Sequence, residues 1–228
     1  MAGCDTFPAG GGNPADSAFP KAERPVAPIV SSRWSNEESR DRQDEAEKIM
    51  DMAGIARGMT VADIGAGEGY YTIRLAQRVG VKGRVLAQDI VPSVRDALAD
   101  RVSRERLDNV SVKLGEPADP KLPAKSFDRI LLVHMYHEIE SPYEFLWRLR
   151  PSLRPGGQVI VVDANRPTAQ HGTPPHLLTC EMGAIGYRRV VFEEAAFAGG
   201  YFTAFEAIGP RPNPDSIISC TLDGLPAK

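Results

Sequence analysis

Short apolar runs alternate with helical segments along most of this 228-residue chain, and this alternation limits the possible folds more than any other feature. Strands are predicted at residues 61–64, 84–88, 110–114, 128–133, 158–162, 189–192 and 201–207, and helices at 71–79, 93–102, 141–152 and 174–186. Strands that follow one another through helices pair in parallel by right-handed crossovers. The sequence therefore predicts a doubly wound α/β fold, with helices on both faces of the sheet.

The chain divides into three stretches. Residues 1–33 are rich in Gly and Pro and lack apolar periodicity, so we expect a flexible N-terminal arm. Ser35 and Glu38 fit a capping box, which predicts a polar helix from Asn36 to Ala53. Residues 34–57 are thus a helical segment placed to act as a lid over a ligand cleft, with a simple surface helix as the alternative. We expect residues 58–228 to form the main domain.

Composition excludes some classes of partner. The chain has 27 Lys and Arg against 30 Asp and Glu, a net charge of −3, which provides no general attraction for nucleic acid. No apolar run approaches the roughly 18 residues that span a bilayer, so no transmembrane segment is expected.

The number and spacing of the cysteines indicate whether the protein works in a reducing or an oxidising cellular compartment. Cys4, Cys180 and Cys220 are odd in number and lack any C-x-x-C spacing, which favours a reducing, cytoplasmic setting with Cys180 packed in a helix. The alternative comes from Ala2-Gly3-Cys4, which resembles the end of a bacterial lipoprotein signal. The chain would then be a cell-envelope lipoprotein whose signal peptide was trimmed before Cys4.

A glycine-rich loop follows the first predicted strand. Asp63 near the end of that strand leads into Gly65, Gly67 and Gly69, at the start of a helix. Glycines serve where the backbone needs positive φ or where a ligand approaches the main chain closely. The G-x-G-x-G spacing differs from the dinucleotide and P-loop motifs. Asp89 closes the second strand, and Glu116, with Asp119 as the alternative, follows the third, so these acids meet the loop at one crevice.

An acid followed by G-x-G-x-G resembles the first motif of the class I S-adenosylmethionine-dependent methyltransferases, and Leu153–Gly157 is similar to their L-x-P-G-G turn. The resemblance covers about residues 58–207 and is nearest to the UbiE/COQ5-like and methyltransferase type 11 sequences. It implies a Rossmann-like, seven-stranded, mostly parallel sheet and S-adenosyl-L-methionine as cofactor. The cofactor-binding residues that it implies are Asp63, Gly65, Ala66, Gly67, Gly69, Tyr71, Asp89, Ile90, Glu116, Pro117 and Val133.

Within that site, the Asp89 carboxylate suits two vicinal ribose hydroxyls, because it accepts several hydrogen bonds. Ile90 would offer an apolar edge to the adenine, and the resemblance implies that Glu116 contacts the adenine amino group.

All four histidines lie between residues 134 and 176, in the regions where the resemblance places the acceptor. His134 and His137 are the leading candidates for a general base, with His171 next, because histidine transfers protons near neutral pH. Each is equally compatible with a structural role. Two or three of them with Asp163 could ligate a divalent ion, but no spacing is diagnostic of one, so no metal is expected.

These features together predict an enzyme that transfers a methyl group from S-adenosylmethionine to oxygen or carbon of a small molecule. Val133-His134-Met135-Tyr136 stands where an N/D-P-P-Y/F motif would indicate amino-methylation of bases or of protein glutamine. The expected partner is thus a small-molecule acceptor and no nucleic acid, with the oligomeric state open. The alternatives are a non-catalytic S-adenosylmethionine-binding module and an aminopropyl-type transferase on the same fold.

Overall fold

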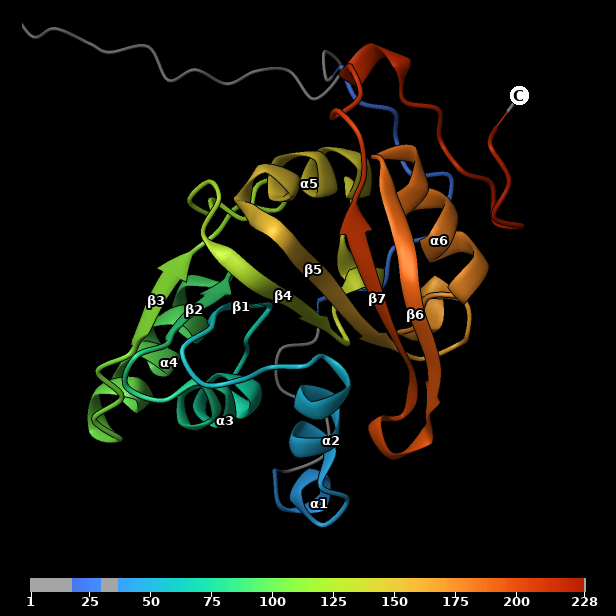
Figure 1. The fold of residues 1–228 in the computed structure, drawn as a ribbon. Coiled ribbons are helices and arrows are strands. Elements are labelled where there is room, and N and C mark those ends of the chain that lie inside the picture. Colours follow the sequence, from blue (N-terminus) through green and yellow to red (C-terminus); the bar gives the residue numbers. More distant parts are fainter. Residues whose placement is uncertain (1–17, 30–36, 228) are drawn as a thin grey trace, which may run out of the picture.

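The computed structural model describes residues 18–29 and 37–227, and its centre is a seven-stranded sheet (Figure 1). The strand order is β3-β2-β1-β4-β5-β7-β6. The strands are β1 (Thr60–Ile64), β2 (Arg84–Asp89), β3 (Val110–Leu114), β4 (Phe127–Val133), β5 (Leu153–Asp163), β6 (Tyr187–Ala195) and β7 (Gly200–Ala207). The first five pair in parallel, whereas β7 runs antiparallel to both β5 and β6. The predicted doubly wound, mostly parallel sheet is confirmed.

In the described part of the chain, six α-helices connect or flank these strands. They are α1 (Glu37–Asp41), α2 (Glu45–Met52), α3 (Tyr70–Val79), α4 (Pro92–Arg104), α5 (Pro142–Leu149) and α6 (Pro175–Ala184). The single helix predicted over 36–53 is wrong, because the chain breaks into α1 and α2 at Asp44, whose φ is 54°. The left-handed conformation of Asp44 interrupts the helical path. The capping residue Ser35 lies outside the described residues.

Two apolar layers cover the two faces of the sheet. Ala62 and Ile64 of β1 pack with α5 and α6, whereas Val61 packs with α2 and α3 on the other face. This division follows from the alternation of side chains along a strand. The central strands therefore need apolar residues at consecutive positions, and Ile130, Leu131 and Leu132 of β4 are all buried.

Residues 18–29 pack against the main domain, which differs from the flexible arm expected for residues 1–33. The Arg24 side chain is buried, and its Nε donates to Glu181 Oε1 of α6 at 2.9 Å. Tyr136 donates its hydroxyl to the other oxygen of Glu181 at 2.7 Å, and Ala27 N donates to His137 O at 3.2 Å. This part of the N-terminal stretch is thus fixed next to the segment that follows β4.

A disulfide joins Cys180 of α6 to Cys220 in the C-terminal segment. The expectation that Cys180 simply packs in a helix is wrong, since its partner lies 40 residues away in a loop without any local signature. The cysteine spacing, which favoured a reducing compartment, did not predict this bond. Cys4 lies outside the described residues, and so does the lipoprotein-like motif. Among the residues that the structure describes, no helix has the length and apolar character needed to cross a membrane.

The buried Arg24–Glu181 pair generates a stability prediction. Arg24→Met leaves the Glu181 carboxylate buried without its cation, which we expect to lower the free energy of unfolding by about 3–5 kcal/mol in urea denaturation. Replacing both residues, as Arg24→Met with Glu181→Leu, should recover part of that loss. Arg42→Met is the control, because Arg42 pairs with Glu38 at an exposed position and should matter little. If Arg24→Met were as stable as the wild type, the expected contribution of the Arg24–Glu181 ion pair to the free energy of unfolding would be contradicted.

Candidate functional site

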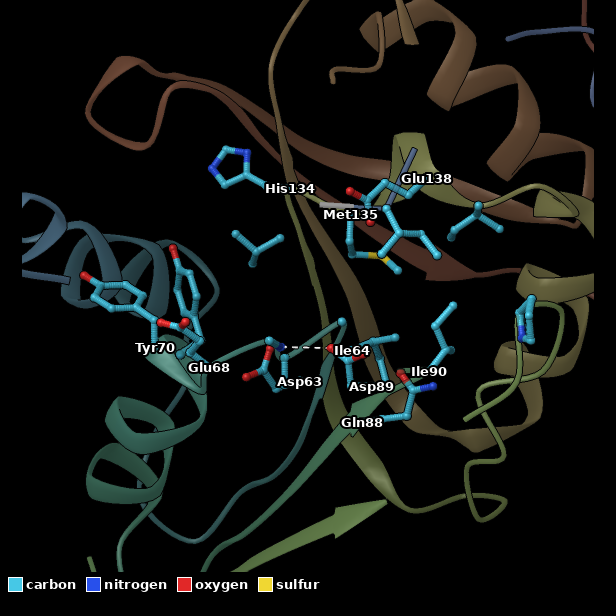
Figure 2. Close-up of a pocket in the computed structure, with 18 of the residues that line it drawn as sticks. Asp63, Ile64, Glu68, Tyr70, Gln88, Asp89, Ile90, His134, Met135 and Glu138 are labelled. Carbon is cyan, nitrogen blue, oxygen red and sulfur yellow. Dashed lines mark hydrogen bonds between the residues drawn. The ribbon is translucent and has the colours of Figure 1, made fainter. Parts of the chain in front are cut away.

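A cavity opens at the carboxyl ends of β1, β2 and β4, where the predicted crevice should be (Figure 2). All but one of the expected cofactor-binding residues line it, namely Asp63, Gly65, Ala66, Gly67, Tyr71, Asp89, Ile90, Glu116, Pro117 and Val133. Gly69 does not line the cavity, and instead precedes α3 with a φ of 90°. The alternative acid Asp119 also lies outside the lining and contacts Lys121 and Arg148.

The glycine loop turns sharply from β1 into α3. Gly65 and Gly67 have φ values of 67° and 54°, a region that side chains other than glycine rarely adopt. A Cβ on Gly65 would lie 3.1 Å from the side chain of Met135, so a larger residue has little room there. Gly65, Ala66 and Gly67 all line the cavity, so this part of the main chain lies within reach of a bound ligand.

Asp89 fastens this loop to the end of β2. Its Oδ2 accepts a hydrogen bond from Gly67 N at 3.1 Å, and its Oδ1 accepts one from Val91 N at 2.9 Å (Figure 2). The carboxylate is mostly buried and lines the cavity. Because a carboxylate has lone pairs for about four hydrogen bonds, it retains capacity for hydroxyl donors on a ligand.

Asp63 lies beneath the loop, almost entirely buried but still part of the cavity lining. Thr72 Oγ1 of α3 donates to its Oδ2 at 2.6 Å. Burial raises the pKa of Asp63 to about 6, since the charged carboxylate loses its hydration there. A positively charged ligand group in the cavity would favour the ionised form and counteract that rise.

Helix α1 contributes Glu37 and Arg40 to the lining, two residues that the sequence analysis did not single out. The Arg40 guanidinium lies 3.8 Å from the centre of the Tyr70 ring and is paired with Glu45 at 2.6 Å. Tyr71 donates its hydroxyl to the same Glu45 at 2.9 Å. Cation–π and ionic contacts thus attach the helical segment to the start of α3. The signal in the sequence was only a charge-rich helix, without any indication of its partner.

The far side of the cavity is formed by the residues after β4. His134, Met135 and Glu138 line it there, across from Asp63 and Asp89 in Figure 2. His134 has a φ of 53°, and its main-chain N donates to Val162 O at 2.8 Å. Burial lowers the pKa of the His134 imidazole, so that the ring is neutral at pH 7. A neutral imidazole facing a cavity can accept a proton from a bound molecule.

His137 and His171 do not line the cavity. His137 is fully buried in a short 3₁₀ helix, Tyr136–Glu138, and its Nδ1 lies 3.0 and 3.1 Å from the two carboxylate oxygens of Asp163. The His171 ring meets His137 edge-on, with ring centres 5.5 Å apart. The fourth histidine, His176, is exposed and bonds Leu222 O. The structure thus brings three histidines near one another but places only His134 at the cavity wall.

Comparison with known proteins agrees with this arrangement. Residues 61–157 match a family model described as "Methyltransferase domain". The chain is 29% identical over 154 residues to an arsenite methyltransferase of Halobacterium salinarum, covering 64% of this chain and 39% of that protein. It is 28% identical over 124 residues to a ubiquinone/menaquinone biosynthesis C-methyltransferase UbiE of Idiomarina loihiensis, covering 53% of this chain and 48% of that one. The chain therefore spans less than two thirds of the length of these relatives.

Among solved structures, a SAM-dependent methyltransferase from Aquifex aeolicus has the same fold. It superposes with a TM-score of 0.64 at 24% identity, and the match covers 75% of this chain and 97% of that one.

Proposed function

We propose that this chain, which carries a class I S-adenosylmethionine-dependent methyltransferase domain, transfers a methyl group from that cofactor to oxygen or carbon of a small-molecule acceptor. The observation that supports this most is that one cavity has the glycine loop and Asp89 on one side and a neutral histidine, His134, on the other.

The residues present fit the cofactor. The glycine loop lines the cavity with its main chain, Asp89 retains acceptor capacity for the ribose hydroxyls, and Glu116 and Ile90 lie in the same lining for the adenine. We propose that Asp63 balances the positive charge at the methionine end, because it is the buried carboxylate beneath the loop. The α1–α2 segment is proposed as the lid, since Glu37 and Arg40 extend into the lining.

When bound, S-adenosylmethionine would supply an electrophilic methyl group, carried on a sulfonium, for in-line transfer to the acceptor. The chain's own task is alignment and proton removal. His134 is proposed as the base, because its side chain lines the cavity and is neutral at pH 7. His137 and His171 are less suited to that role, since neither lines the cavity.

Turnover with methyl-labelled S-adenosylmethionine against a panel of phenols, quinols and carboxylates tests the proposal. We expect the label to appear in an acceptor and S-adenosylhomocysteine to form as the second product. Transfer of an aminopropyl group would instead support the alternative transferase, and tight cofactor binding with no transfer would support a binding module. Absence of any binding at millimolar cofactor would overturn the proposal.

Asp89→Ala should weaken S-adenosylhomocysteine binding by about 1.5–3 kcal/mol, roughly 10- to 150-fold in Kd, because a charged acceptor for the ribose is lost. Isothermal titration calorimetry measures the change. Asp96→Ala is the matched control, since Asp96 lies on the exposed side of α4 and pairs with Arg95. Equal affinities for the two variants would refute the assignment of Asp89.

The affinity for S-adenosylmethionine should rise with pH through about 6. Burial raises the pKa of Asp63 to about 6, so that below this value the carboxyl is protonated and cannot balance the cationic ligand. Above it, the carboxylate favours binding. In the ligand-free protein the raised pKa makes stability fall as the pH increases from the unfolded pKa to about 6, and this loss persists at higher pH. Calorimetry from pH 5 to 8 should show this rise in the wild type and a flatter profile in Asp63→Asn. A wild-type slope in that variant would assign the titration to another group.

His134→Ala should lower turnover by about 100-fold or more once an acceptor is identified, because general-base catalysis contributes at least this factor in typical cases. Its affinity for S-adenosylhomocysteine should change far less, since the base acts on the acceptor. His176→Ala, at an exposed histidine, is the control for the loss of an imidazole. An unchanged turnover rate in His134→Ala would refute the role of His134 as the base and indicate a structural role.

A further inference from the structure

The imidazole of His137 has one nitrogen that is satisfied and one that is not. Its Nδ1 lies 3.0 and 3.1 Å from the two oxygens of Asp163, and a carboxylate only accepts, so Nδ1 carries the proton. In the tautomer with a single proton on Nδ1, the other nitrogen, Nε2, carries a lone pair. That nitrogen is buried and has no hydrogen-bond partner among the described residues. Burying an unsatisfied polar atom costs roughly 1–3 kcal/mol, so its retention calls for a partner.

Asp163 is itself held in one position. Thr173 donates its hydroxyl to Oδ2 at 2.7 Å, and the main-chain N of Ala164 donates to Oδ1 at 2.8 Å. The carboxylate is fully buried at the end of β5. It therefore fixes both the tautomer and the orientation of His137, the role that an outer carboxylate has behind a metal-binding histidine.

Two further donors lie beside His137. One ligand atom each of His137, Glu138 and His171 can be chosen such that all lie within 4.8 Å of one another. Donors bound to one ion at 2.0–2.1 Å are roughly 3–4 Å apart, so a small rotation of the Glu138 or His171 side chain brings the three to bonding distance. Two imidazoles and one carboxylate form a set that suits divalent ions of the first transition row.

We propose that His137, Glu138 and His171 bind a divalent transition-metal ion, with Asp163 as the residue that positions His137. The carboxylates of Glu138 and Asp163 together balance the two positive charges of the ion. Mg²⁺ and Ca²⁺ are disfavoured, because these ions prefer oxygen ligands. A metal was not expected from the sequence, because the spacing of the histidines is not diagnostic and Glu138 was not among the candidate ligands.

The position of Glu138 gives the ion a role in the proposed reaction. Glu138 lines the cavity beside Met135, whereas His137 and His171 lie behind that wall. Three protein ligands leave coordination positions open, so an oxygen of the acceptor can bind the ion from the cavity. This role, unlike metal binding itself, rests on the proposed function. It narrows the acceptor to molecules with a metal-binding oxygen, such as phenols, quinols or carboxylates.

Zinc binding by the full chain tests the site directly. The titrations use chelator-treated protein in a Cys4→Ser background, because the cysteine outside the disulfide could itself bind zinc. We expect about one Zn²⁺ per chain by calorimetry, a loss of about 100-fold or more in His171→Ala and Glu138→Gln, and a loss of about 10- to 100-fold in Asp163→Asn. His176→Ala should bind as the parent does, since its imidazole lies outside the cluster.

Cobalt as a second probe reports the ligands without any turnover. Co²⁺ should give visible absorption bands in the parent and in His176→Ala, and these bands should vanish in His171→Ala. Absence of zinc binding at about 100 µM, or unchanged binding in both His171→Ala and Glu138→Gln, would overturn the proposal.

S-adenosylhomocysteine binding, measured on the same samples, separates the two claims. The cofactor should still bind to His171→Ala, because His171 is not part of the cavity wall. If the cofactor binds but zinc does not, the metal site is refuted while the proposed function stands. Zinc binding without cofactor binding would refute the proposed function alone.

Discussion

The site depends on one constraint of parallel sheets: the carboxyl ends of β1, β2 and β4 all meet at the same edge. The strand order reverses beside β1, with β2 on one side of it and β4 on the other, so the loops that leave these strands diverge and a crevice opens between them. Asp89 fixes the position of one wall of this crevice, because its carboxylate joins the end of β2 to the glycine loop after β1. The wall opposite comes from the residues that follow β4.

Three consecutive residues after β4 connect this wall to the rest of the molecule. Tyr136 donates to Glu181 in a buried network with Arg24, His137 is held by Asp163, and Glu138 reaches the cavity. The polar contacts of these three residues thus all start from a single 3₁₀ turn. Glu181 follows Cys180, whose disulfide also fastens the C-terminal segment. Both ends of the described chain therefore support the segment that forms the cavity wall opposite the glycine loop.

Short-range patterns allowed most of the sheet and the glycine-loop side of the cavity to be predicted. The apolar run at Ile130–Leu132 and the glycines at Gly65 and Gly67 report local requirements of burial and backbone conformation, which one sequence displays. Contacts between residues far apart in the sequence have no such local pattern. Arg24 meets Glu181 across 157 positions and Cys180 meets Cys220 across 40, so neither partner could be inferred from spacing. The break at Asp44 was missed because helical periodicity continues on both sides of it.

The histidines show why residue type and region alone do not assign a role. His134 and His137 are three positions apart, yet one faces the cavity and the other is enclosed behind it. What separates them is access to the cavity and the partner of the ring: Asp163 holds His137 behind the wall, in a ring that lies beside Glu138 and His171. A base must reach the bound acceptor to take its proton, whereas a metal ligand needs an oriented lone pair. The enclosed, carboxylate-held ring of His137 therefore suits the metal site that we propose, and His134 at the wall suits the proton transfer that we propose.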